Sequence, residues 1–363
     1  MKKIRIAAAL MCLLVCVGLF AGCAKSPVVM EYSGEAFTVN FYRYWMSQIK
    51  SNYVSSSMDT DEYWDTKYSN GETYEQKMRE IVDFNVKINL VCQKLFKDMG
   101  LKLDKEEVAK LDTSISDLMA SYGSKSALNT MLSKYGINYK MLRQIYEIEL
   151  KTTTVYDALY AEGGPRAIDD ATLDAYYKDN YSRIDMIIIY DTAEYKKDEK
   201  GDLIFNDVTG SYEKVQLNEE QSKAKNALAD DIMKKLESGA DFDELKAAHN
   251  EDPQGKDFKD GYYISSNDMM IYGADIIKAV AEMQIGDVKK VDDGNIIYIM
   301  KRKELTDKPY KDTVYFDQFE NLIDYCEQAD FNKYMGELIK NVTVFTEETA
   351  KVSVRDAALM NYQ

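Results

Sequence analysis

The stretch Met186-Ile187-Ile188-Ile189-Tyr190 decides the fold, because the spacing of apolar residues changes there. A short run of this kind, rich in β-branched residues, is suited to a buried strand. Before it, apolar residues recur at helical spacing over about 150 residues; after it, strand-like and helical runs alternate. The sequence therefore predicts an α+β protein.

The segment that follows Tyr190 extends this pattern over roughly 100 residues. Its acidic, glycine-containing beginning, residues 191–210, predicts a surface hairpin or loop. Further on, the pattern predicts helices at 219–238, 242–249 and 274–283, and strands at 261–264, 288–291 and 296–300.

The segment before Met186 is predicted to be helical. Its first helix runs from Val39 to Ile49 and places Arg43, Gln48 and Lys50 towards water. The aromatic side chains of this helix, Phe41, Tyr44 and Trp45 among them, form either the core between helices or the lining of an exposed groove.

Further helices are marked by their ends. One runs over residues 72–99 and stops at Gly100, and two others begin at Asp104 and Asn138. A last helix is predicted at 317–340, followed by strand-like pieces at 342–345 and 352–354. Because an amphipathic helix cannot bury its apolar face alone, this tail is expected to pack on the N-terminal helices.

The first residues have the pattern of an export signal. Lys2, Lys3 and Arg5 precede an apolar run from Ile6 to Phe20, and small residues lead to Cys23. The stretch Leu19–Cys23 resembles a bacterial lipobox, although Phe20 stands where leucine is usual. That resemblance implies cleavage after residue 22 and acylation of Cys23, for example with palmitate, at the outer face of the cell membrane. A retained membrane helix and simple secretion are the alternatives.

Charge and cysteine content exclude several classes of function. Residues 1–22 carry three positive charges and no acid, so the net charge falls from −16 to −19 in the mature chain. This charge does not suit nucleic acid. Of the cysteines beyond Cys23, only Cys92 and Cys326 remain, and free buried thiols are preferred over a bridge. With one histidine, no metal site is predicted, and no cofactor is expected.

Several motifs of the middle segment carry a family resemblance. In order along the chain they are Gly239-Ala240-Asp241-Phe242-Asp243-Glu244-Leu245, Asn250-Glu251-Asp252-Pro253, Asp260-Gly261-Tyr262, Gly286-Asp287-Val288 and Gly294-Asn295-Ile296-Ile297. They resemble a parvulin-type peptidyl-prolyl isomerase domain. The flanking segments, such as Ser33-Gly34-Glu35 and Gly136-Ile137-Asn138, resemble the discontinuous chaperone domain of PrsA-type foldase lipoproteins and SurA-type chaperones.

The resemblance implies an organisation and a function. The expected parts are a signal peptide (1–22), a helical chaperone domain (23–175), a parvulin-like domain (176–308) and a C-terminal helix and tail (309–363) that complete the chaperone domain. The implied function is that of a membrane-anchored extracytoplasmic chaperone whose partners are unfolded exported proteins. Phe41, Tyr44 and Trp45 are the candidate client-binding residues, and a homodimer is left open.

The parvulin-like domain departs from its family at the site of catalysis. The positions of the two family histidines fall at Met186 and Ile296, whereas Asp252 suits the position of the family's Cys or Asp. The only histidine, His249, is interpreted as a residue at the end of a helix. Loss of isomerase activity is therefore expected. The alternatives are an active isomerase with a substituted site and a solute-binding lipoprotein, although the latter needs two lobes of alternating strands and helices.

Overall fold

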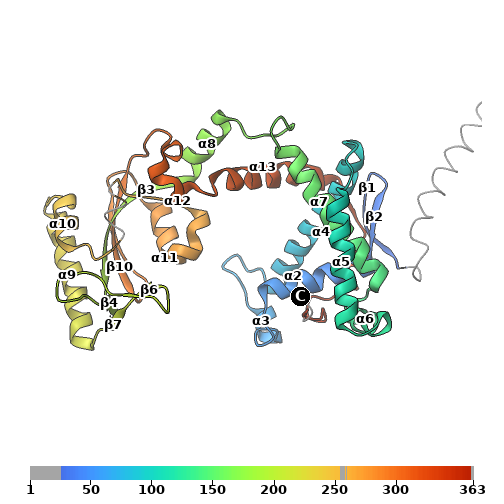
Figure 1. The fold of residues 1–363 in the computed structure, drawn as a ribbon, viewed down its shortest axis with the longest axis horizontal. Coiled ribbons are helices and arrows are strands. Elements are labelled where there is room, and N and C mark those ends of the chain that lie inside the picture. Colours follow the sequence, from blue (N-terminus) through green and yellow to red (C-terminus); the bar gives the residue numbers. More distant parts are fainter. Residues whose placement is uncertain (1–25, 254–257, 259, 361–363) are drawn as a thin grey trace, which may run out of the picture. The chain divides into compact units, whose positions relative to one another are not determined.

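The protein consists of two compact units. The computed structural model describes residues 26–253, 258 and 260–360 (Figure 1). One unit comprises the residues up to 167 together with those from 327 onward, and the other comprises residues 168–326. The α+β fold class is as predicted.

The unit boundaries differ from the expected ones at 175/176 and 308/309. Helix α8 (Asp170–Asn180) and helix α12 (Phe316–Phe319) both belong to the second unit. They meet in one aromatic cluster, where Tyr177 packs on Phe319 with ring centroids 5.7 Å apart. This cluster thus joins residues of α8 and α12 within the second unit.

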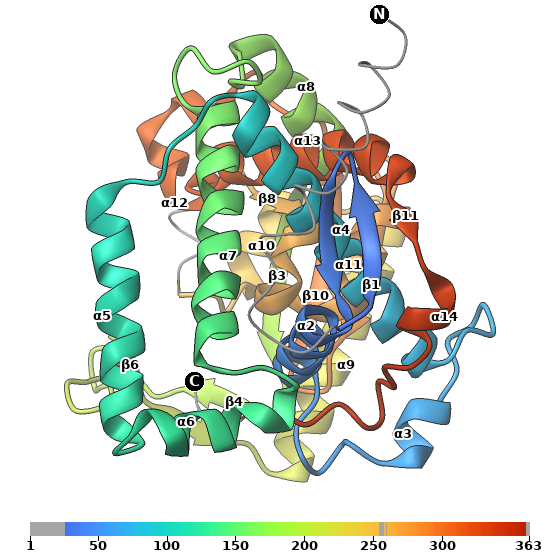
Figure 2. The ribbon, with the colours of Figure 1, turned by 90° about the vertical axis from the view of Figure 1, so that its right-hand side faces the viewer.

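Helices make up most of the first unit. They include α2 (Val39–Tyr53), α3 (Asp61–Asp65), α4 (Tyr74–Asp98), α5 (Lys105–Ser121), α6 (Lys125–Leu132) and α7 (Tyr139–Tyr160), together with the part of α13 (Leu322–Leu338) from residue 327 onward (Figure 2). Local side chains begin them as expected: Asp104 accepts hydrogen bonds from two backbone amides of α5, and Asn138 does the same for α7. Gly100, with φ of +66°, follows the end of α4 in the left-handed conformation.

A small antiparallel sheet in the first unit was not predicted. Strand β1 (Val28–Tyr32) lies between β2 (Glu35–Thr38) and β11 (Thr343–Val344), and Met30 is paired with Val344. The strand-like piece at 342–345 is thus confirmed. The predicted strand at 352–354 is wrong, because this segment follows α14 (Thr346–Thr349) as irregular chain and buries Val352 and Val354 in the helical core.

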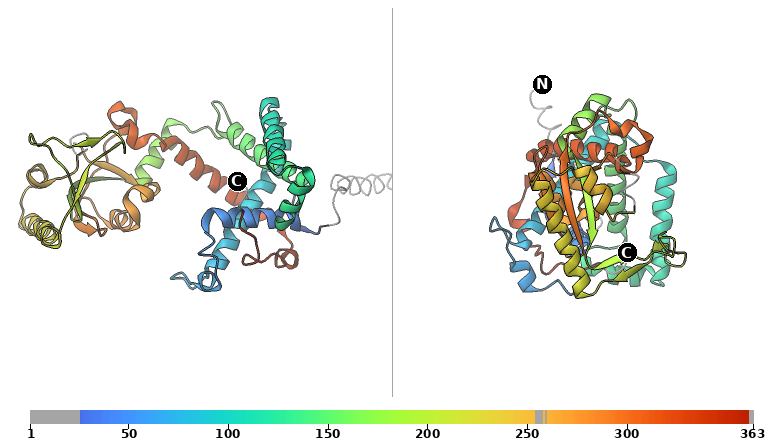
Figure 3. Two further views of the ribbon diagram at one scale, coloured as in Figure 1. Left: turned by 60° about the horizontal axis from the view of Figure 1, so that its bottom comes forward. Right: turned by 90° about the vertical axis from the view of Figure 1, so that its left-hand side faces the viewer.

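The second unit is built on a four-stranded antiparallel sheet. Its order is β8 (Tyr262–Ser265), β3 (Tyr181–Tyr190), β10 (Ile296–Lys303) and β9 (Val288–Asp292). Helices α9 (Glu219–Glu237) and α10 (Phe242–His249) cover one face, and α11 (Met269–Glu282) covers the other (Figure 3). Alternate residues of β3 serve the two faces: Ile187 and Ile189 pack towards α9 and α10, and Met186 and Ile188 pack towards α11.

A buried carboxylate supports the sheet from the α10 side. Asp185 on β3 is buried, and its oxygens lie 2.5 Å from the Lys246 ammonium and 3.0 Å from the Lys303 ammonium. Burial alone would raise the pKa of Asp185, but the two ammonium groups outweigh it and lower the pKa below its ordinary value. The stabilisation is therefore present above the carboxyl pKa of the unfolded chain and is lost as pH falls through the lower folded value.

Replacing Asp185 by alanine should lower the free energy of unfolding of the second unit by about 3 kcal/mol, because two ammonium groups lose their counter-ion in a buried place. Both tryptophans, Trp45 and Trp64, belong to the first unit. The urea-unfolding transition measured by circular dichroism should therefore move to a lower urea concentration. The transition measured by tryptophan fluorescence should stay in place. Asp231→Ala, which removes an exposed pair with Lys235, should leave the circular dichroism transition unchanged. Equal shifts for the two variants would contradict the stabilising role given to Asp185.

Candidate functional site

The aromatic side chains expected to bind clients are buried in the first unit. Phe41, Tyr44 and Trp45 are only 3%, 1% and 2% exposed, and they belong to the main helical core. Trp45 packs against Phe37 at 4.7 Å between ring centroids, and its indole N–H donates to Glu149 at 3.4 Å. In this conformation these residues form core, which is the alternative interpretation of the pattern.

Lys50 is a second correction on the same helix. The sequence pattern places it in water, yet its side chain is fully buried. Its ammonium group donates to the backbone carbonyls of Arg355 at 3.1 Å and Ala357 at 2.9 Å, and pairs with Asp59 at 2.8 Å. No sequence pattern signals this role, because the partners are carbonyl groups about 300 residues away.

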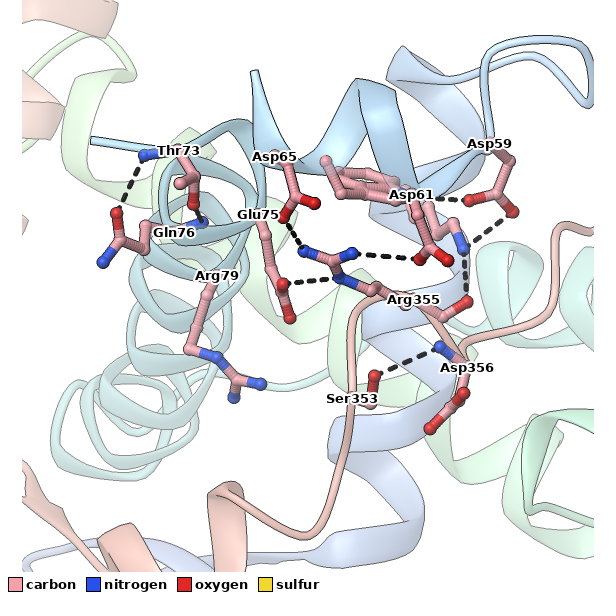
Figure 4. Close-up of polar contacts among 12 residues, drawn as sticks. Asp59, Asp61, Asp65, Thr73, Glu75, Gln76, Arg79, Ser353, Arg355 and Asp356 are labelled. Carbon is pink, nitrogen blue, oxygen red and sulfur yellow. Dashed lines mark hydrogen bonds and ion pairs between the residues drawn. The ribbon is translucent and has the colours of Figure 1, made fainter. Parts of the chain in front are cut away.

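The segment that Lys50 holds, residues 349–360, is here named the C-terminal strap. Arg355 in the strap pairs with three carboxylates, Asp61 at 2.9 Å, Asp65 at 2.6 Å and Glu75 at 2.8 Å (Figure 4). Arg79 of α4 donates to strap carbonyls at 2.8 and 3.3 Å. The strap is therefore fastened by side chains from α2, α4 and the region of α3.

In the second unit, the two positions that correspond to family histidines share one sheet face. Met186 on β3 is fully buried and pairs with Met300 of β10, and the partly buried Ile296 pairs with Tyr190. Both side chains belong to the cluster under α11. A thioether and a branched alkyl group cannot exchange a proton, and neither offers a strong hydrogen-bond donor.

Asp252 is held next to this face by the segment that follows α10. The backbone N–H of Glu251 donates to the Ile188 carbonyl at 2.9 Å, and the Tyr190 N–H donates to the Glu251 side chain at 2.9 Å. The Ile188 N–H donates to the side chain of Asn250 at 2.8 Å. These contacts attach residues 250–251 to β3 and present the next residue, Asp252, to the hydroxyl of Tyr262, which donates to it.

Tyrosines supply the polar groups of the face. Burial, then the hydrogen bond to Asp252, raises the pKa of Tyr262 far above its usual value. The pKa of Tyr298 is raised to about 12 by burial and by the carboxylates of Asp293 and Asp252. These hydroxyls stay protonated at neutral pH, so the face offers weakly acidic donors around one carboxylate. The signal that was missed is the tyrosine content of the strands at Tyr190, Tyr262 and Tyr298.

The remaining candidate groups add no further chemistry. His249 is half-buried at the last position of α10. Cys92 and Cys326 are buried and are not joined in a disulfide, and burial raises the pKa of Cys92 to about 12. In the part of the chain that the structure describes, no three His, Cys, Asp or Glu side chains cluster in a way that could hold a metal ion, and no helix is long and apolar enough to cross a membrane.

Comparison with known proteins gives one family match. Residues 40–162 match the family model of the bacterial trigger factor C-terminus. No curated protein sequence matches the chain.

Solved structures of three bacterial proteins match this chain over most of their own length. PrsA of Bacillus subtilis is 17% identical, with 77% of this chain and 91% of that chain covered and a TM-score of 0.22. The foldase protein PrsA of Streptococcus pneumoniae is 17% identical, with 78% and 95% covered and a TM-score of 0.24. A SurA-like chaperone of Campylobacter jejuni is 12% identical, with 88% and 98% covered and a TM-score of 0.28.

Replacing Lys50 by methionine should lower the free energy of unfolding of the first unit by about 3 kcal/mol, because Asp59 and two strap carbonyls lose a buried partner while side-chain volume is kept. Tryptophan fluorescence under urea measures this directly, since Trp64 lies 5.4 Å from the Lys50 ammonium. Lys77→Met, on an exposed pair with Glu80, is the matched control and should unfold at the same urea concentration as the wild type. If both variants unfold at the same urea concentration, the strap is not held by Lys50.

Proposed function

We propose that this protein is a membrane-anchored extracytoplasmic chaperone that binds unfolded exported proteins and has lost isomerase activity. The observation that carries the proposal is the match of residues 40–162 to the trigger factor C-terminal family model. The export signal and the resemblance to foldase lipoproteins support it from the sequence.

Exposed apolar side chains give the proposal a physical basis. Met270 and Ile271, at the start of α11, are 97% and 74% exposed, with Met269 beside them half-exposed. Large contiguous apolar side chains in water commonly mark interaction sites. Methionine adapts its shape to varied apolar partners, which suits a protein that binds many unfolded chains.

The anchor is part of the proposal. Cys23 and the preceding signal lie outside the described residues, so the argument for acylation rests on the lipobox resemblance. An acyl chain contributes about 0.8 kcal/mol for each buried methylene, and two or more chains hold a protein firmly at a membrane. Labelling of cells with a radioactive fatty acid should mark the wild-type protein and leave Cys23→Ala unmarked.

The competing solute-binding function finds no support in the fold. A solute-binding lipoprotein needs two lobes in which strands and helices alternate around parallel sheets. All strand pairs of the described residues are antiparallel, and the first unit is mainly helical.

The purified mature chain should suppress aggregation of a chemically denatured model protein at several-fold molar excess, as followed by light scattering. The variant Met270→Ser with Ile271→Ser should suppress less, because it removes apolar contact area that a client would cover. Ile285→Ser in the same unit, at an exposed position in a turn, is the control and should act as wild type. Light scattering equal to that of the untreated model protein would refute the chaperone function.

A proline-peptide isomerisation assay should give the rate of the buffer blank. Uncatalysed rotation about the prolyl bond meets a barrier of about 18–20 kcal/mol, and catalysis needs polar groups placed to favour the twisted amide. Met186 and Ile296 supply none, and Tyr262 already donates to Asp252. Wild type and Asp252→Ala should therefore be equal. A wild-type rate above the blank that Asp252→Ala abolishes would instead establish an isomerase with a substituted site.

A further inference from the structure

An insertion between β3 and α9 extends the tyrosine-rich face of the second unit. Residues 191–217, here named the hairpin insertion, form two short antiparallel ladders, β4 (Ala193–Tyr195) with β7 (Lys214–Gln216) and β5 (Phe205–Asn206) with β6 (Ser211–Tyr212). Phe205 pairs directly with Tyr212, and Tyr195 pairs with Lys214.

Four rings connect the sheet to the tip of this insertion. Tyr190 of β3 packs edge-on against Tyr195 at 5.1 Å, Tyr195 against Tyr212 at 6.1 Å, and Tyr212 against Phe205 at 5.3 Å. Tyr190 is buried on the sheet face, whereas Tyr212 and Phe205 are 44% and 51% exposed. This aromatic ladder, made of these four rings, therefore runs from the interior into water.

The position of Lys214 indicates that the aromatic ladder attracts cations. The ammonium group of Lys214 lies 5.0 Å from the ring centroid of Tyr190 and 4.7 Å from that of Tyr195. Aromatic faces attract cations at such distances through the ring quadrupole. Over the two outer rings, Tyr212 and Phe205, no such contact is made by any described lysine or arginine.

The net charge of the hairpin insertion indicates which kind of partner fits the exposed rings of Phe205 and Tyr212. The hairpin insertion has seven acidic residues against four lysines, and the whole chain has a net charge of −16. Two of the lysines are already engaged, Lys196 with Glu213 at 2.9 Å and Lys214 with the inner rings. A cationic segment is therefore attracted, while a second copy of this chain and an anionic lipid surface are repelled.

We propose that Phe205 and Tyr212 bind an extended client segment in which a lysine or arginine stands next to an apolar residue. The cation covers the exposed ring faces, as Lys214 does on the inner rings, and the apolar residue packs along the ladder. This inference rests on the proposed function, since it names the kind of client sequence that the second unit selects.

Fluorescence anisotropy with labelled extended peptides tests the inference on the soluble mature chain. Two peptides share one apolar sequence, and one carries lysine and arginine where the other carries glutamate. We expect the basic peptide to bind at least fivefold more tightly. Phe205→Ala and Tyr212→Ala should each weaken its binding by about three- to fivefold, the scale of one cation–π contact. Tyr212→Phe, which keeps the ring, should bind as wild type.

Two further variants make the test specific. Val208→Ala changes a 95% exposed residue at the same tip that is not part of the ladder, and it should leave binding unchanged. Lys214→Ala removes the internal cation that occupies the inner rings, and it should strengthen binding of the basic peptide. Near-ultraviolet circular dichroism of the tyrosines checks that each variant is folded.

The outcomes separate this inference from the proposed function. Equal binding of the two peptides, wild-type binding by Phe205→Ala and Tyr212→Ala, or no gain in Lys214→Ala would overturn it, even if the chain still suppresses aggregation. Dimerisation or binding to anionic vesicles that is lost in Phe205→Ala would assign the ladder to another occupant and would also overturn it. A chain that binds neither peptide and fails to suppress aggregation would refute the proposed function itself.

Discussion

The buried ammonium group of Lys50 is the constraint on which the first unit depends. An ammonium group that leaves water must regain its hydrogen bonds and a counter-charge, or the folded state loses several kcal/mol. Here the partners are Asp59 and two carbonyls of the strap, so the helix α2 and the end of the chain can only be buried together. The pairing of β1 with β11 joins the same distant parts of the chain a second time. The helical core is thus closed by residues from both sides of the inserted second unit.

The sheet of the second unit presents one face to α11. Asp252 is fixed beside β3 on this side by Asn250 and Glu251. Around that carboxylate stand the hydroxyls of Tyr262 and Tyr298, whose pKa values are raised by burial and by nearby carboxylates. Under the proposed function, such a face would hold a polypeptide by ring contacts and hydrogen bonds, which requires no catalytic residue.

Features that depend on local chemistry could be predicted, and features that depend on distant partners could not. Asp104, Asn138 and Gly100 act within one helical turn, so their sequence context was enough to find the helix ends. The hairpin of β1 and β2 is an exception, because its strands pair locally across the turn at Ser33 and Gly34 and were still missed. The pairing of β1 with β11, some 300 residues away, leaves no local signal. Lys50 was placed in water because a helical pattern shows which face a residue occupies but not which carbonyls reach it. The cluster of Tyr190, Tyr262 and Tyr298 could not be predicted, because it depends on the register of strands that lie far apart in the sequence.

The division of the chain has a consequence for the order in which its parts can fold. During synthesis from the N-terminus onward, residues 168–326 are made before the strap and β11, so the second unit has all its strands while the first still lacks its last partners. During that interval the core of α2 and α4 is incomplete, with Lys50 and Arg79 unpaired by the strap. Completion of the first unit must wait for the final dozen residues. A premature stop near the end of the coding region would therefore leave a folded second unit attached to an open, aggregation-prone first one.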